Sequence, residues 1–222
     1  MLSDRFGRRV LAAAAAAVAP LAATIFTPAG TASAQGCPDV QVVFARGTSE
    51  PPGIGRVGQA LADSLRAQLG GRSVGTYGVN YAATYDFLKS ADGANDAANH
   101  IAAMAQQCPG TRIVLGGYSQ GAAVVDMLAG VPPLGNRIGD LGSAPPLAGS
   151  LNGNVAAVAV FGNPSTKFGN PVSAAGSFAG KAIDLCADGD PICSNGRNPF
   201  AHTRYETPEF IGPAAGFAAG RI

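Results

Sequence analysis

Runs of apolar residues predict five buried β-strands in this chain. Residues 40–45 and 155–161 are almost continuously apolar and rich in valine and alanine. Strands of this composition are typical of a parallel sheet that is covered by helices on both faces. Three less uniform segments, at about 74–81, 112–116 and 181–185, complete the set.

Helical segments alternate with these strands. Apolar residues recur at helical spacing over 57–69, where two glycines end the helix, and a second helix is predicted over about 93–107. Segments rich in proline and glycine at 130–154 and 162–180 are predicted surface loops, and the tail at 207–222 is a predicted last helix. The alternation predicts an α/β fold with a central, mostly parallel five-stranded sheet flanked by helices. In such a sheet the loops after the strands form the active site.

A serine between two glycines follows the strand at 112–116. In Gly117-Tyr-Ser-Gln-Gly121 the serine stands between a strand and an amphipathic helix. At such a sharp turn the glycines avoid the collisions that a Cβ would make, and the turn projects the serine into a cleft. The same pattern around Ser73 follows a helix and precedes a strand, which is the opposite order. We therefore predict Ser119, and not Ser73, as a nucleophile.

A serine nucleophile requires a base. The hydroxyl attacks poorly unless a positioned histidine takes its proton, and that histidine needs an acid to fix its tautomer. The chain contains two histidines. In this strand–turn–helix architecture the chain order is nucleophile, acid, histidine, and His100 precedes the serine. His202 is therefore the predicted base, and His100 is expected to be a solvated or hydrogen-bonded helix residue.

Three aspartates stand at suitable positions for the acid. Asp184 lies within the strand at 181–185, so its side chain cannot easily turn into a cleft. Asp188 and Asp190 lie in a loop bounded by two cysteines, and a disulfide across that loop would hold an acid rigidly. The spacing alone slightly favours Asp190 over Asp188.

An oxyanion that develops on the substrate needs donors that are already in place. The turn itself supplies the backbone N–H of Gln120, the residue after the nucleophile. The loop after the first strand supplies the second candidate, Thr48, through its N–H and its hydroxyl. Ser49 is the alternative.

The N-terminal residues have the pattern of an export signal. Three arginines precede an apolar stretch over 10–26, and small residues at 32–34 match the pattern before a signal-peptidase site. We predict a secretory signal at 1–34 and a single domain at 35–222, in a secreted protein or one associated with the cell envelope. Pro20 interrupts the apolar stretch and Pro28 follows it, which disfavours a membrane anchor, and no integral membrane segment is expected after cleavage.

The charge balance excludes some classes of partner. Cleavage would remove three of the 15 basic and one of the 14 acidic residues, leaving 12 against 13 and a formal charge of −1. The chain has no cluster of Lys and Arg and no basic stripe interleaved with aromatic residues. Binding to nucleic acid is therefore not expected. We expect a monomer.

All four cysteines, Cys37, Cys108, Cys186 and Cys193, follow the predicted signal. An even number in an exported chain suggests two disulfides, with three possible connectivities. The short separation of Cys186 and Cys193 suits a locally closed loop and would leave Cys37 to join Cys108. A zinc site is disfavoured because the chain has no Cys-x-x-Cys pair and only two histidines.

Three separated stretches together resemble the cutinase family of secreted serine esterases, particularly its bacterial cutinase-like branch. They are residues 44–50, the serine motif at 117–121, and Cys-Ala-Asp-Gly-Asp-Pro-Ile-Cys at 186–193 followed by Ala-His-Thr-Arg-Tyr at 201–205. The resemblance spans about 37–210. It implies a small α/β-hydrolase without a large lid.

The resemblance also implies the roles of individual residues. By position, Ser119 is the nucleophile, Asp190 the acid and His202 the base. Thr48 and Gln120 form the oxyanion hole, although fungal members of the family carry serine where this chain has Thr48.

The same resemblance implies the disulfides Cys37 to Cys108 and Cys186 to Cys193.

The expected activity is the hydrolysis of carboxylic esters with short to medium acyl chains, with an ester or lipid substrate and without metal or cofactor. Ile192 and Phe200 flank the predicted acid and base and are candidate walls for an acyl chain. Acetylxylan esterase and phospholipase activity are alternatives within the same chemistry. A noncatalytic surface-binding protein is the alternative from another class, which the full set of serine, acid and histidine disfavours.

Overall fold

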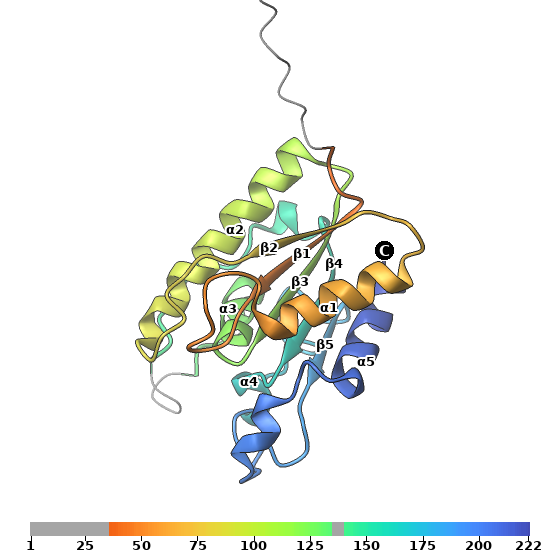
Figure 1. The fold of residues 1–222 in the computed structure, drawn as a ribbon. Coiled ribbons are helices and arrows are strands. Elements are labelled where there is room, and N and C mark those ends of the chain that lie inside the picture. Colours follow the sequence, from red (N-terminus) through yellow and green to blue (C-terminus); the bar gives the residue numbers. More distant parts are fainter. Residues whose placement is uncertain (1–35, 135–139) are drawn as a thin grey trace, which may run out of the picture. The chain divides into compact units, whose positions relative to one another are not determined.

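The fold is described by a computed structural model for residues 36–134 and 140–222. The predicted export signal at 1–34 lies outside these residues. Within them, five strands form one parallel sheet in the order β2-β1-β3-β4-β5 (Figure 1). The strands are β1 (Val40–Ala45), β2 (Val74–Gly78), β3 (Arg112–Tyr118), β4 (Val155–Phe161) and β5 (Ala182–Leu185).

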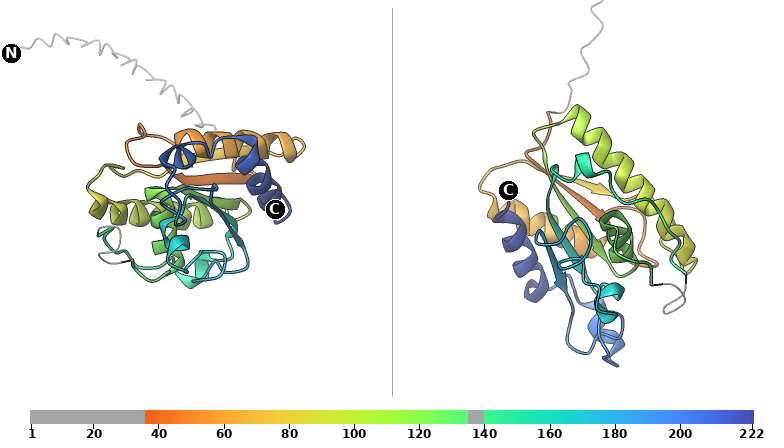
Figure 2. Two further views of the ribbon diagram at one scale, coloured as in Figure 1. Left: turned by 90° about the horizontal axis from the view of Figure 1, so that it is seen from below. Right: turned by 180° about the vertical axis from the view of Figure 1, so that it is seen from behind.

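Helices cover both faces of this sheet. One face packs against α1 (Gly55–Gln68) and α5 (Pro208–Ala219). The opposite face packs against α2 (Ser90–Gln107) and α3 (Gln120–Ala129), and the resulting three layers are visible in Figure 2. The predicted α/β fold is confirmed.

The apolar strands follow from this two-sided burial. In β1, Val42 and Phe44 belong to the core beneath α1 and α5, whereas Val43 and Ala45 belong to the core beneath α2 and α3. All four side chains are fully buried. A strand with helices on both faces has no solvent-facing positions, which is why its sequence shows no alternation of apolar and polar residues.

Most element boundaries agree with the predictions from the sequence. β1 and β4 have the predicted bounds, β2 ends earlier than predicted, and β3 continues to Tyr118. Within the predicted loop at 162–180 the chain forms a short helix, α4 (Pro164–Lys167). A four-residue helix is too short to produce an apolar periodicity, so the pattern could not reveal it. Short 3₁₀ turns lie at η1 (Phe87–Lys89), η3 (Gly149–Leu151) and η4 (Pro199–Thr203).

The parallel arrangement brings distant loops to one edge of the sheet. Because all strands point the same way, the segments after β1, β3, β4 and β5 all begin at the carboxyl-terminal edge. Thr48, Ser119 and Asp190 follow three of these strands. The candidate functional residues therefore converge although they are far apart in the sequence.

Two disulfides, with the pairing that the resemblance implied, fasten parts of this framework. Cys37 to Cys108 joins the segment before β1 to the end of α2, with 5.5 Å between the Cα atoms. Cys186 to Cys193 closes the loop after β5, with 5.8 Å between the Cα atoms. Among the described residues, no helix combines the length and apolarity needed to span a membrane.

Removing the Cys37–Cys108 disulfide is predicted to lower the free energy of unfolding. The bond spans a sequence separation of 71 residues, and restricting a loop of that size in the unfolded chain stabilises a fold by roughly 4 kcal/mol. Urea unfolding of a variant with both Cys37→Ser and Cys108→Ser, followed by circular dichroism, measures the loss. An unfolding free energy equal to that of the wild type would contradict this account.

Candidate active site

Ser119 occupies a strained turn between β3 and α3. Its backbone has φ 55° and ψ −115°, a conformation that residues with a side chain rarely adopt. A Cβ on Gly117 would lie 2.1 Å from the carbonyl oxygen of Gly121, and one on Gly121 would lie 1.9 Å from that of Ala45. Both contacts are with backbone atoms that cannot give way, so both positions require glycine. The turn has the geometry predicted from the serine motif.

Ser119, His202 and Asp190 form a continuous series of hydrogen bonds. The Oγ of Ser119 lies 2.8 Å from Nε2 of His202, and Nδ1 of His202 lies 2.7 Å from Oδ2 of Asp190. A carboxylate can only accept at Nδ1, so the neutral imidazole carries its proton there and accepts the serine proton at Nε2. This arrangement can activate the hydroxyl as a nucleophile.

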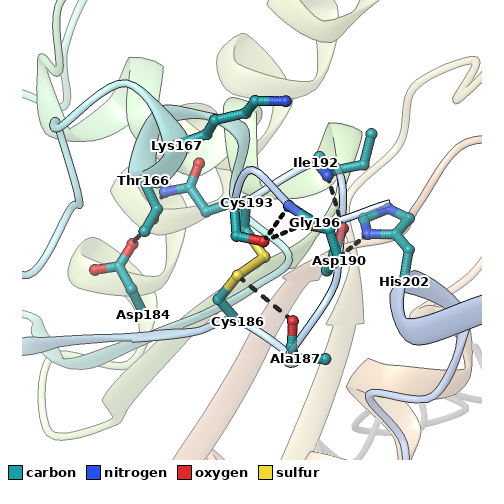
Figure 3. The surroundings of a disulfide bond; sticks show 12 residues. Thr166, Lys167, Asp184, Cys186, Ala187, Asp190, Ile192, Cys193, Gly196 and His202 are labelled. Carbon is teal, nitrogen blue, oxygen red and sulfur yellow. Dashed lines mark hydrogen bonds and ion pairs between the residues drawn. A yellow bond between two sulfur atoms is a disulfide. The ribbon is translucent and has the colours of Figure 1, made fainter. Parts of the chain in front are cut away.

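Asp190 is a fully buried carboxylate with several donors. Oδ1 accepts from the backbone N–H of Ile192 at 2.7 Å, and Oδ2 accepts from Nδ1 of His202, as Figure 3 shows. Oδ2 also accepts from the hydroxyl of Tyr205. Burial opposes ionisation, but the hydrogen bonds from His202, Tyr205 and Ile192 outweigh it and hold the pKa of Asp190 below its ordinary value. The acid therefore stays charged while it is shielded from water.

The other two candidate acids face elsewhere. Asp188 is exposed to solvent. Asp184 accepts hydrogen bonds from the side chains of Asn163 and Thr166, at 3.1 and 3.0 Å. Among the three aspartates considered from the sequence, Asp190 is the one that contacts the imidazole.

The loop that carries Asp190 is fastened at several points. The Cys186–Cys193 disulfide closes it, and the backbone N–H of Asp190 donates to the carbonyl of Ala187 at 3.0 Å. The N–H of Ala187 in turn donates to the hydroxyl of Tyr205 at 2.9 Å. These bonds fix the carboxylate before any substrate arrives.

Thr48 and Gln120 lie together beside the nucleophile. The Thr48 hydroxyl donates to Oε1 of Gln120 at 3.0 Å, and Nε2 of Gln120 donates to the Ser90 hydroxyl at 3.1 Å. Ser90 itself donates to the carbonyl of Phe87, which fixes the orientation of the glutamine amide. Because the Thr48 hydroxyl donates to Gln120, the backbone N–H groups of Thr48 and Gln120 are the candidate donors to an oxyanion.

The helix and the neighbouring turn support this choice. Gln120 is the first residue of α3, and the first N–H groups of a helix have no intrahelical acceptor. Ser49, the alternative to Thr48, donates its backbone N–H to the carbonyl of Ala83 at 2.7 Å, and its side chain is exposed.

A cleft of about 440 Å³ opens beside Ser119. Ile192 lines it, whereas Phe200 is 77% exposed and lies outside the set of lining residues. The prediction that Phe200 forms a wall is therefore not supported by the shape of this cleft. The lining residues are Thr48, Tyr85, Phe87, Tyr118, Ser119, Gln120, Leu141, Pro164, Lys167, Pro191, Ile192, His202 and Thr203.

Sequence reasoning did not assign a role to two further residues that shape the site. The hydroxyl of Tyr205, a fully buried residue, reaches Asp190. Gly162 follows β4 with φ +59°, and a Cβ there would lie 2.7 Å from Cε1 of His202. The glycine therefore makes room for the imidazole. Its position directly after a strand was the available sign in the sequence.

His100 and Ser73, which were not predicted to be catalytic, have other hydrogen-bond partners. His100 lies on α2, with Nε2 at 2.8 Å from Oε1 of Gln41, and its ring stacks on Tyr77. Burial lowers the pKa of His100. The hydroxyl of Ser73, directly before β2, donates to Asp39, directly before β1. Within the described residues, no group of three or more His, Cys, Asp or Glu could hold a metal ion.

The described domain is similar to proteins of one family. A family model described as Cutinase matches residues 36–222. Phospholipase Culp4 of Mycobacterium tuberculosis is 52% identical over 217 residues, which cover 97% of this chain and 92% of that protein. The probable carboxylesterase Culp3 of the same organism is also 52% identical, over 89% of this chain and 74% of that protein.

Two solved structures have the same fold. An acetylxylan esterase superposes with a TM-score of 0.72 at 25% identity, covering 83% of this chain and 99% of that one. A cutinase of Trichoderma reesei in complex with a phosphonate inhibitor superposes with a TM-score of 0.66 at 37% identity, covering 83% of this chain and 76% of that one.

Asp190→Asn is predicted to reduce kcat by several orders of magnitude, because an amide in place of the carboxylate no longer selects the tautomer protonated at Nδ1. The corresponding substitution in the serine-protease triad costs about 10,000-fold. Asp188→Asn is the matched control, since that side chain is exposed and two residues away. Turnover of p-nitrophenyl butyrate by the two variants measures the difference, and a larger loss in Asp188→Asn would reverse the assignment of the acid.

Tyr205→Phe is predicted to lower kcat about tenfold, the scale of one hydrogen bond to a charged group. The Tyr205 hydrogen bond is one of the causes that hold the pKa of Asp190 below its ordinary value, so without this donor the pKa of Asp190 rises and the carboxylate is lost at a higher pH. The acid side of the pH–rate profile should therefore move to higher pH.

Tyr77→Phe is the matched control for this change, because Tyr77 also donates its hydroxyl to an aspartate, Asp96, at 2.9 Å. If the pH–rate profile of Tyr205→Phe did not move and both variants lost the same amount of kcat, Tyr205 would contribute only packing and would not position Asp190.

Proposed function

The chain belongs to the cutinase family and is a carboxylic ester hydrolase, and we propose that it cleaves esters of short to medium acyl chains through an acyl-enzyme on Ser119. The observation that carries the proposal is the series of hydrogen bonds from Ser119 through His202 to a buried Asp190. A noncatalytic binding protein would not need this series.

Acylation begins with the attack of the Ser119 hydroxyl on the ester carbonyl carbon. His202 takes the serine proton at Nε2, and the charge of Asp190 stabilises the imidazolium. The backbone N–H groups of Thr48 and Gln120 donate hydrogen bonds to the negatively charged oxygen that forms from the carbonyl. The tetrahedral intermediate then expels the alcohol, which receives the proton held by His202.

Deacylation repeats these steps with water as the nucleophile. His202 removes a proton from a water molecule while the water oxygen attacks the acyl carbon. Collapse of the second intermediate releases the carboxylic acid, and the proton returns from His202 to Ser119. The cycle consumes one ester and one water and yields one acid and one alcohol, so it requires no cofactor.

The cleft suits an acyl chain of limited length. Its volume is about 440 Å³, and Tyr85, Phe87, Leu141 and Ile192 supply apolar surface along it. Tyr85 is 79% exposed, so part of this apolar surface is open to water. Burial of each methylene group of a substrate contributes about 0.8 kcal/mol as long as apolar wall remains to cover it. Longer chains gain little more because they extend beyond the cleft.

Two other ester substrates have specific support. A relative with 52% identity is named a phospholipase, which favours the acyl esters of phospholipids as a second candidate. The structural similarity to an acetylxylan esterase favours acetylated sugars. Both substrates would use the same acyl-enzyme chemistry, so they differ only in what the cleft must accommodate.

The two disulfides favour an oxidising environment, and with the predicted signal they support secretion. We propose that the enzyme acts outside the cytoplasm, as a monomer.

Ser119→Ala is predicted to abolish both ester hydrolysis and labelling by a fluorophosphonate probe, because the probe reacts with the activated serine oxygen. Ser73→Ala is the matched control: Ser73 lies in the same Gly-x-Ser-x-Gly pattern but interacts with Asp39. Turnover of p-nitrophenyl esters with two to sixteen acyl carbons would give the chain-length preference. Wild-type protein that neither hydrolyses these esters nor takes up the probe would refute the proposed function.

A further inference from the structure

Charged side chains are scarce among the described residues that line the cleft. Among the described residues that line it, Lys167 is a cation, and no arginine, aspartate or glutamate is present. The carboxylate of Asp190 lies fully buried behind His202 and does not line the cleft. A substrate in the cleft therefore meets a positive charge that no carboxylate among the described lining residues balances.

The ammonium group of Lys167 has unused hydrogen-bonding capacity. Nζ donates to the carbonyl of Pro191 at 2.8 Å, which uses one of its three protons. None of the ion pairs in the described part of the chain includes Lys167. By contrast, Nζ of Lys89 lies 3.7 Å from Asp92, and Lys181 donates to two backbone carbonyls.

Hydrogen bonds to α3 fix the beginning of α4, the helix that carries Lys167. Lys167 is the last residue of α4, and Asn163 caps the start of that helix by accepting from the N–H of Ser165 at 2.9 Å. The Ser165 hydroxyl and the amide of Asn163 both donate to the buried carboxylate of Asp126. The beginning of α4 is therefore fastened to α3.

A second carboxylate holds the other part of α4. Thr166 donates to Asp184 of β5 at 3.0 Å, as Figure 3 shows beside the disulfide of the acid-bearing loop. The backbone of Lys167 is thus fixed through its neighbour, and its side chain is fixed at Nζ by Pro191. A cation that is positioned before binding loses little conformational freedom when it meets a ligand.

We propose that Lys167 forms an anion subsite in the cleft, and that the enzyme selects esters that carry a phosphate or a carboxylate near the scissile bond. The inference rests on the proposed ester hydrolysis at Ser119 and names the class of substrate for it. A half-buried ammonium gives up part of its hydration, and an anionic group of the substrate replaces it with a charge-assisted hydrogen bond. Lysine suits this role because it acts as a point charge toward either anion.

Lys167 also connects α4 to the loop of the predicted acid, so a purely structural role must be distinguished. A structural support for the carbonyl of Pro191 would affect neutral and anionic substrates equally. An anion subsite affects the anionic substrates more. The ratio of kcat/KM for an anionic ester to that for a neutral ester of equal length separates the two roles.

Two pairs of substrates supply this ratio and distinguish the source of the anion. The carboxylate pair is the p-nitrophenyl monoester of glutaric acid and p-nitrophenyl pentanoate. The phosphate pair is dihexanoyl phosphatidylglycerol and dihexanoylglycerol. Lys167→Met is predicted to lower the ratio about tenfold in at least one pair, the lower end of the contribution of a hydrogen bond to a charged group. The pair that responds identifies the anion.

Two further variants control for charge and packing. Lys167→Arg keeps the positive charge and is expected to retain a ratio above that of Lys167→Met. Lys89 lies in the same 3₁₀ turn, η1, as the cleft residue Phe87, and its ammonium already pairs with Asp92. Lys89→Met should therefore leave the ratio unchanged. A fall of the ratio in Lys167→Met alone supports the subsite.

An unchanged ratio in both pairs for Lys167→Met would overturn the inference while leaving the proposed function intact. An equal fall of the ratio in Lys89→Met would also overturn it, since the effect would then come from net charge. Wild-type protein that hydrolyses none of the four esters would instead contradict the proposed function, and the subsite with it.

Discussion

The buried negative charge of Asp190 is the constraint around which the carboxyl-terminal part of the chain is organised. A carboxylate out of contact with water is very costly unless donors surround it. Here the donors are His202, the hydroxyl of Tyr205 and the N–H of Ile192. Each belongs to a different local structure, and the Cys186–Cys193 disulfide keeps the loop in the shape that lets all three reach the carboxylate. The hydrogen bonds that stabilise the buried charge include the one that orients the imidazole of His202. The stability of this region and the geometry of the site therefore depend on the same contacts.

The nucleophile depends on a second constraint, the close approach of α3 to the end of β1. Gly121 packs against the carbonyl of Ala45 with no room for a side chain, and the turn just before it gives Ser119 its positive φ. The parallel sheet then brings the loop with Thr48 to the start of α3, where the Thr48 hydroxyl contacts the side chain of Gln120. Strain at one residue is offset by the packing of two buried elements, which is how such a turn can persist in a stable fold.

Among its described lining residues, the cleft combines apolar side chains with the cation of Lys167. Lys167 stands on α4, a helix too short to be stable alone, and the bonds to Asp126 and Asp184 are what hold it in place. These two carboxylates take no part in the proposed chemistry, yet they position the residue that we connect with the charge of the substrate. In the proposed mechanism Ser119, His202 and Asp190 cleave the ester, and the contacts of α4 position the residue that we propose to select it.

The sequence by itself determined the strands, the sheet and the place of the sharp turn that carries Ser119, because apolar runs and the strand–serine–helix order depend on local periodicity and on turns that require glycine. His202 followed from chain order and from the small number of histidines. The family resemblance named Asp190 and Thr48, but the residues by themselves left Asp188 and Ser49 open as alternatives. Only the tertiary structure shows that Asp190 faces the imidazole and that Thr48 lies beside Gln120. It also decided the contacts of Tyr205 and Lys167. These choices concern the direction of side chains within loops, where no periodicity operates and where hydrogen bonds to residues far along the chain fix the backbone.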